Sequence, residues 1–155
     1  MTRRVWSAVA VLSTAVACGG SGTRPSAPLV HVAGQYDIQK LVVEDTCDTM
    51  LAGQTFTNPA TVRHTAGATA FVLNDHGTRD LPGTVRPDGS FTLDPARAIV
   101  HGSIPALDTF DNGRFTSTGF GVRNTTALDA TPISAACNVV AEWTATKQGA
   151  PNVIP

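Results

Sequence analysis

The pattern that decides the fold lies in residues Cys137–Thr146, which read CNVVAEWTAT. Cysteine, valine, alanine, tryptophan and alanine occupy every second position, and polar residues lie between them, with Val140 as the exception. Successive side chains of a β-strand point to opposite faces. The alternation therefore predicts a strand with one buried face and one face in water.

Three turn signals separate further runs rich in Val, Thr and Phe. They are Arg86–Ser90 (RPDGS), Phe110–Phe115 (FDNGRF) and Asn74–Gly77 (NDHG). Proline presets φ, aspartate and asparagine accept local hydrogen bonds, and glycine takes the left-handed position of a tight turn. No stretch of ten or more residues has helical periodicity, so the chain predicts an antiparallel meander. The expected strands are 34–44, 60–66, 68–75, 81–87, 90–95, 98–103, 113–124 and 137–147.

The first residues resemble a bacterial lipoprotein signal peptide. Arg3 and Arg4 precede an uncharged, mostly apolar run, and the sequence Ala15-Val16-Ala17-Cys18 leads into glycines. The run is too short to span a bilayer. The resemblance implies cleavage before Cys18 and a diacylglyceryl thioether on its sulfur, an effectively permanent anchor. An ordinary secretory signal cut near the same alanines is the alternative.

The resemblance also implies an envelope location, and Gly19 permits the outer membrane. The domains expected from this reading are a signal peptide (1–17), a lipid-anchored flexible tether (18–33), a β-barrel domain (34–147) and a flexible tail (148–155).

Two cysteines then remain, Cys47 and Cys137. In an exported domain they predict a disulfide, with two free thiols as the alternative. In an up-and-down barrel with an even strand number the first and last strands are neighbours. Cys47 follows the first strand and Cys137 opens the last, so a bond there would join them. We expect an all-β fold whose antiparallel meander closes into a roughly eight-stranded barrel, with a β-sandwich as the alternative. A bulge near Leu41 would reconcile the two apolar faces of the first strand.

Gly34-Gln35-Tyr36 opens the first strand where many lipocalins have Gly-x-Trp, and in length and strand pattern the chain resembles the lipocalin-like and avidin-like small barrels. Tyrosine replaces the signature tryptophan. The resemblance implies a barrel whose interior can hold a small apolar ligand. An eight-stranded barrel is either filled by its own side chains or holds one such ligand. The large apolar side chains expected inside, as candidate ligand contacts, are Tyr36, Phe71, Phe91, Phe115 and Trp143.

The sequence gives little support for a catalytic site or a metal-binding site. The histidines His31, His64, His76 and His101 lie at no metal-ligand spacing, and there is no Gly-x-Ser-x-Gly elbow. We therefore expect no metal, no cofactor and no enzymatic activity. The formal net charge is −1, and no basic cluster is present, which argues against nucleic acid as a partner.

The sequence thus predicts a membrane-anchored binding module for a small apolar ligand. Two alternatives stay open: a protein-interaction module, such as an inhibitor of an envelope-attacking enzyme, and a structural lipoprotein. The expected long loops 45–59, 104–112 and 125–136 are where a protein partner would bind.

Overall fold

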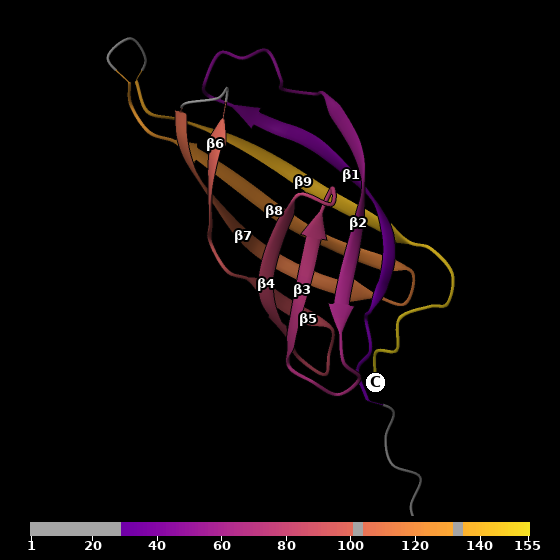
Figure 1. Ribbon diagram of the computed structural model, residues 1–155. Helices are drawn as coiled ribbons and strands as arrows, with labels where there is room; N and C mark the ends of the chain where they lie inside the picture. Colours follow the sequence, from indigo (N-terminus) through magenta and orange to yellow (C-terminus); the bar gives the residue numbers. More distant parts are fainter. Residues whose placement is uncertain (1–28, 101–103, 132–134) are drawn as a thin grey trace, which may run out of the picture.

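The computed structural model describes residues 29–100, 104–131 and 135–155, so the proposed signal peptide and Cys18 lie outside the described residues. The described part forms one antiparallel sheet of nine strands (Figure 1). Eight of them close into the barrel that the sequence predicts, and β6 is an extra strand along β7. The strands are β1 (Gly34–Asp45), β2 (Thr55–His64), β3 (Ala70–Asp75), β4 (Arg79–Val85), β5 (Ser90–Leu93), β6 (Ala96–Val100), β7 (Ile104–Thr116), β8 (Gly119–Leu128) and β9 (Cys137–Lys147).

The first and last strands are joined as expected. β1 pairs with β9 from Tyr36 opposite Lys147 to Asp45 opposite Val139. The register shifts between Val42 and Glu44, so the predicted bulge exists and lies two residues beyond Leu41. Past the end of this pairing Cys47 and Cys137 form the predicted disulfide, with their Cα atoms 5.1 Å apart.

The barrel closes a second time, and narrowly, between β5 and β7. Only Ser90 and Phe91 pair with β7 there, opposite Arg114 and Gly113. At Asp94-Pro95 the pairing of β5 with β4 ends, because proline has no N–H to continue the ladder. The chain then follows β7 as β6 (Figure 1). Residues 79–81 of β4 consequently have no strand partner on this side within the described residues, and we call the opening between them and β6 the β4–β6 slot.

Two expectations for the segment 104–124 are wrong. Residues 104–112 form most of β7 and not a loop, and 113–124 is not one strand but a hairpin that turns at Ser117-Thr118. The Asn112-Gly113 signal makes a bulge inside β7, where Asn112 has φ 57° and the register shifts. Gly119 allows the hairpin to lie close to β9, since a Cβ there would come within 1.8 Å of the Ala145 carbonyl oxygen.

The other two expected loops are also shorter than predicted. β2 already begins at Thr55, within 45–59, and β8 continues to Leu128, within 125–136. The turns at Arg86–Ser90 and Asn74–Gly77 are confirmed as the connections β4–β5 and β3–β4.

One end of the barrel is filled by aromatic rings. Their centroids lie 4.6 to 6.4 Å apart, typical of tilted and edge-to-face contacts. We call this end the closed end and the group the aromatic cluster, which consists of Tyr36, Phe71, Phe91, Phe115 and Phe120.

Both ends of the described chain seal the closed end (Figure 1). Val30 and Val32 are buried there, and His31 forms a β-bridge with Val153. Asn152 is also buried; its Oδ1 accepts a hydrogen bond of 2.7 Å from the Tyr36 hydroxyl. Burial raises the pKa of Tyr36, and the bond to Asn152 opposes that shift in part. The packed domain therefore extends from Val30 into residues 148–155, which we expected to be a flexible tail.

Candidate binding site at the barrel mouth

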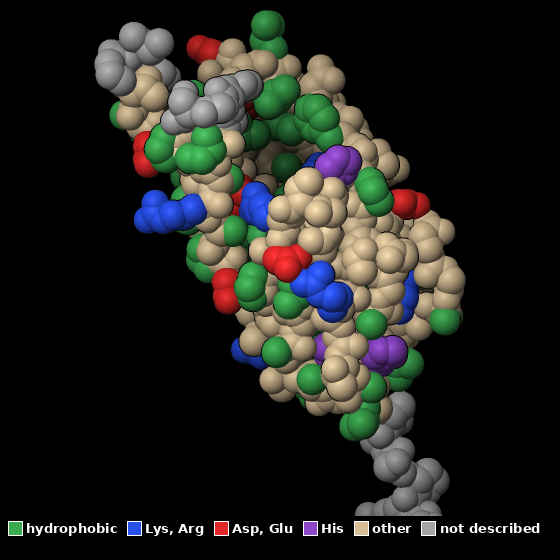
Figure 2. Space-filling view, in the orientation of Figure 1, with side chains coloured by type: hydrophobic (Ala, Val, Ile, Leu, Met, Phe, Trp, Pro, Cys, Tyr) green, Lys and Arg blue, Asp and Glu red, His purple; other side chains and the backbone are tan. Residues whose placement is uncertain are grey.

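The other end of the barrel is open. A pocket of about 300 Å³ lies there, and Figure 2 shows the hollow with hydrophobic, basic and acidic side chains around it. We call it the mouth pocket. It is lined by Lys40, Val42, Leu51, Phe56, Asp75, Arg79, Ala98, Asp108, Asn124, Thr126, Val139, Ala141 and Trp143.

Lys40 and Asp75 form the first of two ion pairs in the pocket wall. Lys40 is an inward-facing residue of β1, and its Nζ lies 2.8 and 3.0 Å from the two Asp75 oxygens. The same Nζ lies 3.9 Å from the ring centroid of Trp143, a cation–π contact. Asp75 also accepts a hydrogen bond of 2.6 Å from the Asn58 amide. Both oxygens of this carboxylate are therefore engaged.

Arg79 and Asp108 form the second pair, which bridges the β4–β6 slot. Arg79 opens β4 and Asp108 lies in β7, and the distance from Arg79 Nη1 to Asp108 Oδ2 is 2.6 Å. The other carboxylate oxygen accepts from Asn124 Nδ2 at 3.2 Å and from the Thr126 hydroxyl. A buried carboxylate needs such partners, because its transfer from water is costly. The pair thus joins β4 to β7 where the described residues form no backbone ladder.

Three buried nitrogen donors of the pocket residues have no hydrogen-bond partner within the described part of the chain. They are Arg79 Nε, Arg79 Nη2 and Trp143 Nε1. An unsatisfied buried donor costs roughly 1–3 kcal/mol, and more when it is charged. Two cations and two carboxylates balance formally, and both carboxylates are occupied. The three nitrogens have almost no accessible surface, so they lie within the wall and do not face the pocket.

The β1–β2 connection forms part of the rim and is held by Asp45. Its carboxylate accepts from the backbone N–H groups of Leu51 at 3.0 Å and Cys47 at 2.9 Å, and from the Thr49 hydroxyl at 2.8 Å. These bonds, that of Leu51 first and that of Thr49 next, lower the pKa of Asp45. They place Leu51 at the pocket and Cys47 at its disulfide.

The five aromatic candidates from the sequence are divided between the two ends. Tyr36, Phe71, Phe91 and Phe115 belong to the aromatic cluster and pack against one another. Trp143 lines the mouth pocket and makes an edge contact with Phe110, with centroids 5.5 Å apart.

The sequence reasoning missed the charged residues of the site. Lys40 lies two positions from both Ile38 and Val42, so it shares their inward face. Asn124 stands in the same relation to Val122 in β8. A polar residue in register with an apolar face was the available signal. It becomes informative only when the strand positions are known.

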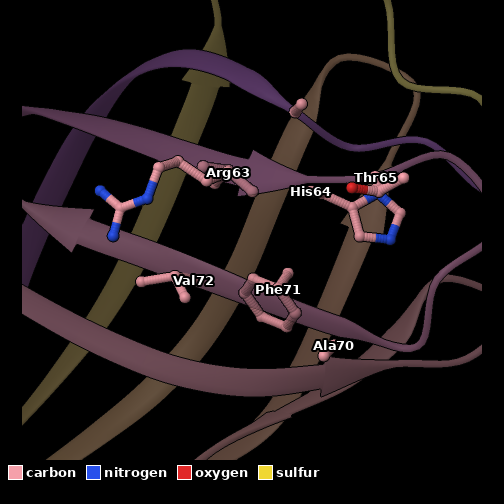
Figure 3. Close-up of a pocket in the computed structure, with 8 residues that line it drawn as sticks. Arg63, His64, Thr65, Ala70, Phe71 and Val72 are labelled. Carbon is pink, nitrogen blue, oxygen red and sulfur yellow. The ribbon is translucent and has the colours of Figure 1, made fainter.

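A second, wider hollow lies over β2 and β3. Figure 3 shows Arg63 and Val72 side by side on these strands and His64 at the end of β2. Both ring nitrogens of His64 are engaged: Nδ1 accepts the Val32 N–H at 3.3 Å, and Nε2 lies 2.9 Å from the Ala68 carbonyl oxygen. This histidine therefore acts as a structural link to the N-terminal segment.

Other kinds of site find no support in the described ranges. Within 29–100, 104–131 and 135–155 no three His, Cys, Asp or Glu side chains are grouped to hold a metal ion; His101 lies outside these ranges. The same ranges contain no helix long and apolar enough to cross a membrane. Comparison with protein-family models, curated proteins and solved structures finds no match to this chain. The site must therefore be interpreted from its own chemistry.

Proposed function

We propose that the protein is a non-catalytic binding module that holds a small molecule in the mouth pocket and is anchored to a bacterial membrane through a lipid on Cys18. The observation that carries the proposal is the open end of the barrel, where apolar side chains and two ion pairs line a pocket of about 300 Å³. The volume is at the lower end of small-molecule sites, so the ligand is small.

The place where the described chain begins supports such a role at a membrane. Leu29 and His31, where the described chain begins, lie at the closed end beside Val153 (Figure 1). The mouth pocket lies at the opposite end, beside the β1–β2 connection. A chain anchored at Cys18 would thus enter the described domain at its closed end.

Binding in the pocket is tested with the full-length chain and two alanine variants. Ala98→Leu places extra volume at the pocket wall, whereas Ala127→Leu adds the same volume at a half-buried position of β8 outside the pocket. The fluorescence of the neutral apolar dye N-phenyl-1-naphthylamine should rise with the parent chain and with Ala127→Leu, and much less with Ala98→Leu. Equal fluorescence with all three chains would contradict binding at the mouth.

The anchor is tested separately. Cys18→Ala should move the protein from the membrane fraction to the soluble fraction after cell lysis, because the thioether can no longer form. Continued membrane fractionation of this variant would contradict the lipoprotein interpretation.

A second candidate function is the docking of an envelope protein at the mouth. Exposed apolar side chains concentrate at this end, and Met50 in the β1–β2 connection is 87 % exposed. Such a surface is typical of an interaction site. An inhibitor of an envelope-attacking enzyme such as lysozyme would use it, and Met50→Ser should then relieve the inhibition without changing dye binding. The exposed apolar residues at this end are Leu41, Val43, Met50, Phe56, Ile99 and Leu107.

A further inference from the structure

We infer that the open edge of β6 binds an extended peptide segment of a partner protein, which adds a strand to the sheet at the β4–β6 slot. The segment carries a carboxylate opposite Arg97 and an apolar side chain opposite Ala98. This inference goes beyond the proposed binding of a small molecule, because it rests on the backbone of β6 and adds a protein partner.

The register of β6 shows which of its backbone groups are open. β6 lies at the end of the sheet and pairs only with β7 in the described part of the chain (Figure 1). Asp129 N donates to the Pro105 carbonyl oxygen at 3.2 Å, so Pro105 turns its carbonyl toward β8. Pro105 stands opposite Ile99, and hydrogen-bonded positions alternate along an antiparallel pair. Ile99 and Arg97 therefore direct their N–H and C=O groups away from β7, to the open edge.

The edge of β4 across the slot is open as well. The Pro82 carbonyl oxygen accepts a hydrogen bond of 2.8 Å from Asp94 N, so Pro82 faces β5. By the same alternation Asp80 turns its backbone groups to this side, where the described residues provide no strand. The slot thus has open strand edges on both sides. Such edges are a template for an added strand, whose main chain supplies the matching donors and acceptors.

The side chains of β6 specify two positions of the added strand. Ala98 lines the mouth pocket, whereas Arg97 and Ile99 are exposed on the outer face. Successive side chains of a strand alternate between faces. The peptide residue opposite Ala98 therefore points toward the mouth pocket and its apolar lining. The residue opposite Ile99, which is 64 % exposed, covers that side chain and is also apolar.

Charge complementarity favours a partner peptide over a second copy of this chain. The cross-strand neighbour of Arg97 on β7 is Leu107, and no ion pair among the described residues includes Arg97. A carboxylate directly across from Arg97 stabilises the pairing. In an antiparallel pair of two β6 strands that uses both open residues, Arg97 would instead stand opposite Ile99 of the second copy.

The test uses the full-length chain and the peptide fluorescein-Ser-Thr-Val-Phe-Glu-Thr-Ser-amide. In the antiparallel register its valine, phenylalanine and glutamate stand opposite Ile99, Ala98 and Arg97. Fluorescence anisotropy measures the Kd. N-methylation of the glutamate removes an N–H that faces β6 and should raise the Kd at least tenfold. N-methylation of the phenylalanine, whose N–H faces away from β6, is the matched control and should change the Kd much less.

Protein variants test the same pairing from the other side. Ile99→Pro removes the N–H at the open edge and leaves the ladder with β7 intact, since proline is tolerated where the N–H of an edge strand faces solvent. It should raise the Kd at least tenfold, whereas Ile99→Val should stay within twofold of the parent chain. Arg97→Glu should weaken binding about fivefold, and a peptide with lysine in place of glutamate should restore it. Circular dichroism checks that each variant is folded, and the N-methylated peptides need no variant.

Each alternative has its own result. Absence of binding at millimolar peptide, or equal Kd values for the two N-methylated peptides, overturns strand addition at β6. Unchanged binding of the glutamate peptide by Arg97→Glu overturns the carboxylate position. A dimer of the full-length chain in analytical ultracentrifugation that Ile99→Pro dissociates would make a second copy the occupant and overturn the partner assignment. The dye experiment on Ala98→Leu and Ala127→Leu reports on the pocket ligand separately, so the two proposals can fail independently.

Discussion

The ion pair between Arg79 and Asp108 should hold the β4–β6 slot together, and Asp108→Asn tests this directly. Asparagine has nearly the same shape and keeps one carbonyl oxygen for Asn124 and Thr126. The change therefore removes mainly the negative charge opposite Arg79. The Asp108 side chain is 6 % exposed and that of Arg79 is 28 % exposed.

The expected magnitude follows from these exposures. Removing one partner of a fully buried ion pair costs about 3–5 kcal/mol, because the other charge stays buried without compensation. Since Arg79 is partly in contact with solvent, we expect Asp108→Asn to lower the free energy of unfolding by about 2–3 kcal/mol. Urea titration of the full-length chain, followed by circular dichroism, measures this loss.

Two comparisons make the prediction specific. Glu142→Gln breaks the exposed pair with Arg123, whose side chains are 40 % and 44 % exposed, and should cost less than about 1 kcal/mol. The double variant Arg79→Gln/Asp108→Asn should be more stable than the sum of the single losses predicts, by at least about 1 kcal/mol. Losses that add, or an Asp108→Asn loss no larger than that of Glu142→Gln, would refute the role assigned to this pair.

Three further predictions concern other parts of the barrel. Replacing Cys47 and Cys137 by serine should lower the unfolding free energy by about 4 kcal/mol in urea, because the disulfide closes a loop with a sequence separation of 90; a loss below about 1 kcal/mol would contradict this. The folded-state pKa of Asp45 is lowered, so its contribution to stability is complete above its unfolded pKa of about 3.9 and is lost as the pH falls through the folded pKa. Asp45→Asn should therefore destabilise the protein more at pH 6 than at pH 2, and urea midpoints that differ equally at both pH values would be inconsistent with that reasoning. Tyr36→Phe removes the buried hydroxyl, whose one proton is shared between the Val32 carbonyl oxygen and Asn152 Oδ1, and should cost about 1–2 kcal/mol. The raised pKa of Tyr36 means that the parent chain loses stability above about pH 10, where the unfolded tyrosine ionises, and Tyr36→Phe should show a smaller alkaline loss.

Features that depend on a few neighbouring residues could be predicted. The alternation in Cys137–Thr146 marks β9 because period-two burial is a property of a single strand. The turn at Arg86–Ser90 follows from local conformational preferences. The disulfide followed from the positions of Cys47 and Cys137 relative to two strands and from the neighbour relation that any closed meander imposes.

The Asn112-Gly113 signal shows where local reasoning fails. A left-handed residue followed by glycine suits a hairpin turn and also a bulge, and the sequence is the same in both cases. In the barrel Gly113 lies opposite Phe91, where a Cβ would come within 2.6 Å of its ring. The contact with another strand, and not the turn preference, makes this position a bulge.

The sequence by itself determined an all-β meander, the disulfide that joins the first and last strands, and a set of aromatic side chains inside the barrel. Only the tertiary structure decided how these aromatics divide, with four of the five candidates filling the closed end and Trp143 left at the mouth. It also brought Arg79 to Asp108 and Lys40 to Asp75 from different strands. The physical reason is that burial periodicity is local, whereas the environment of a charge depends on which strands the closed barrel places beside it.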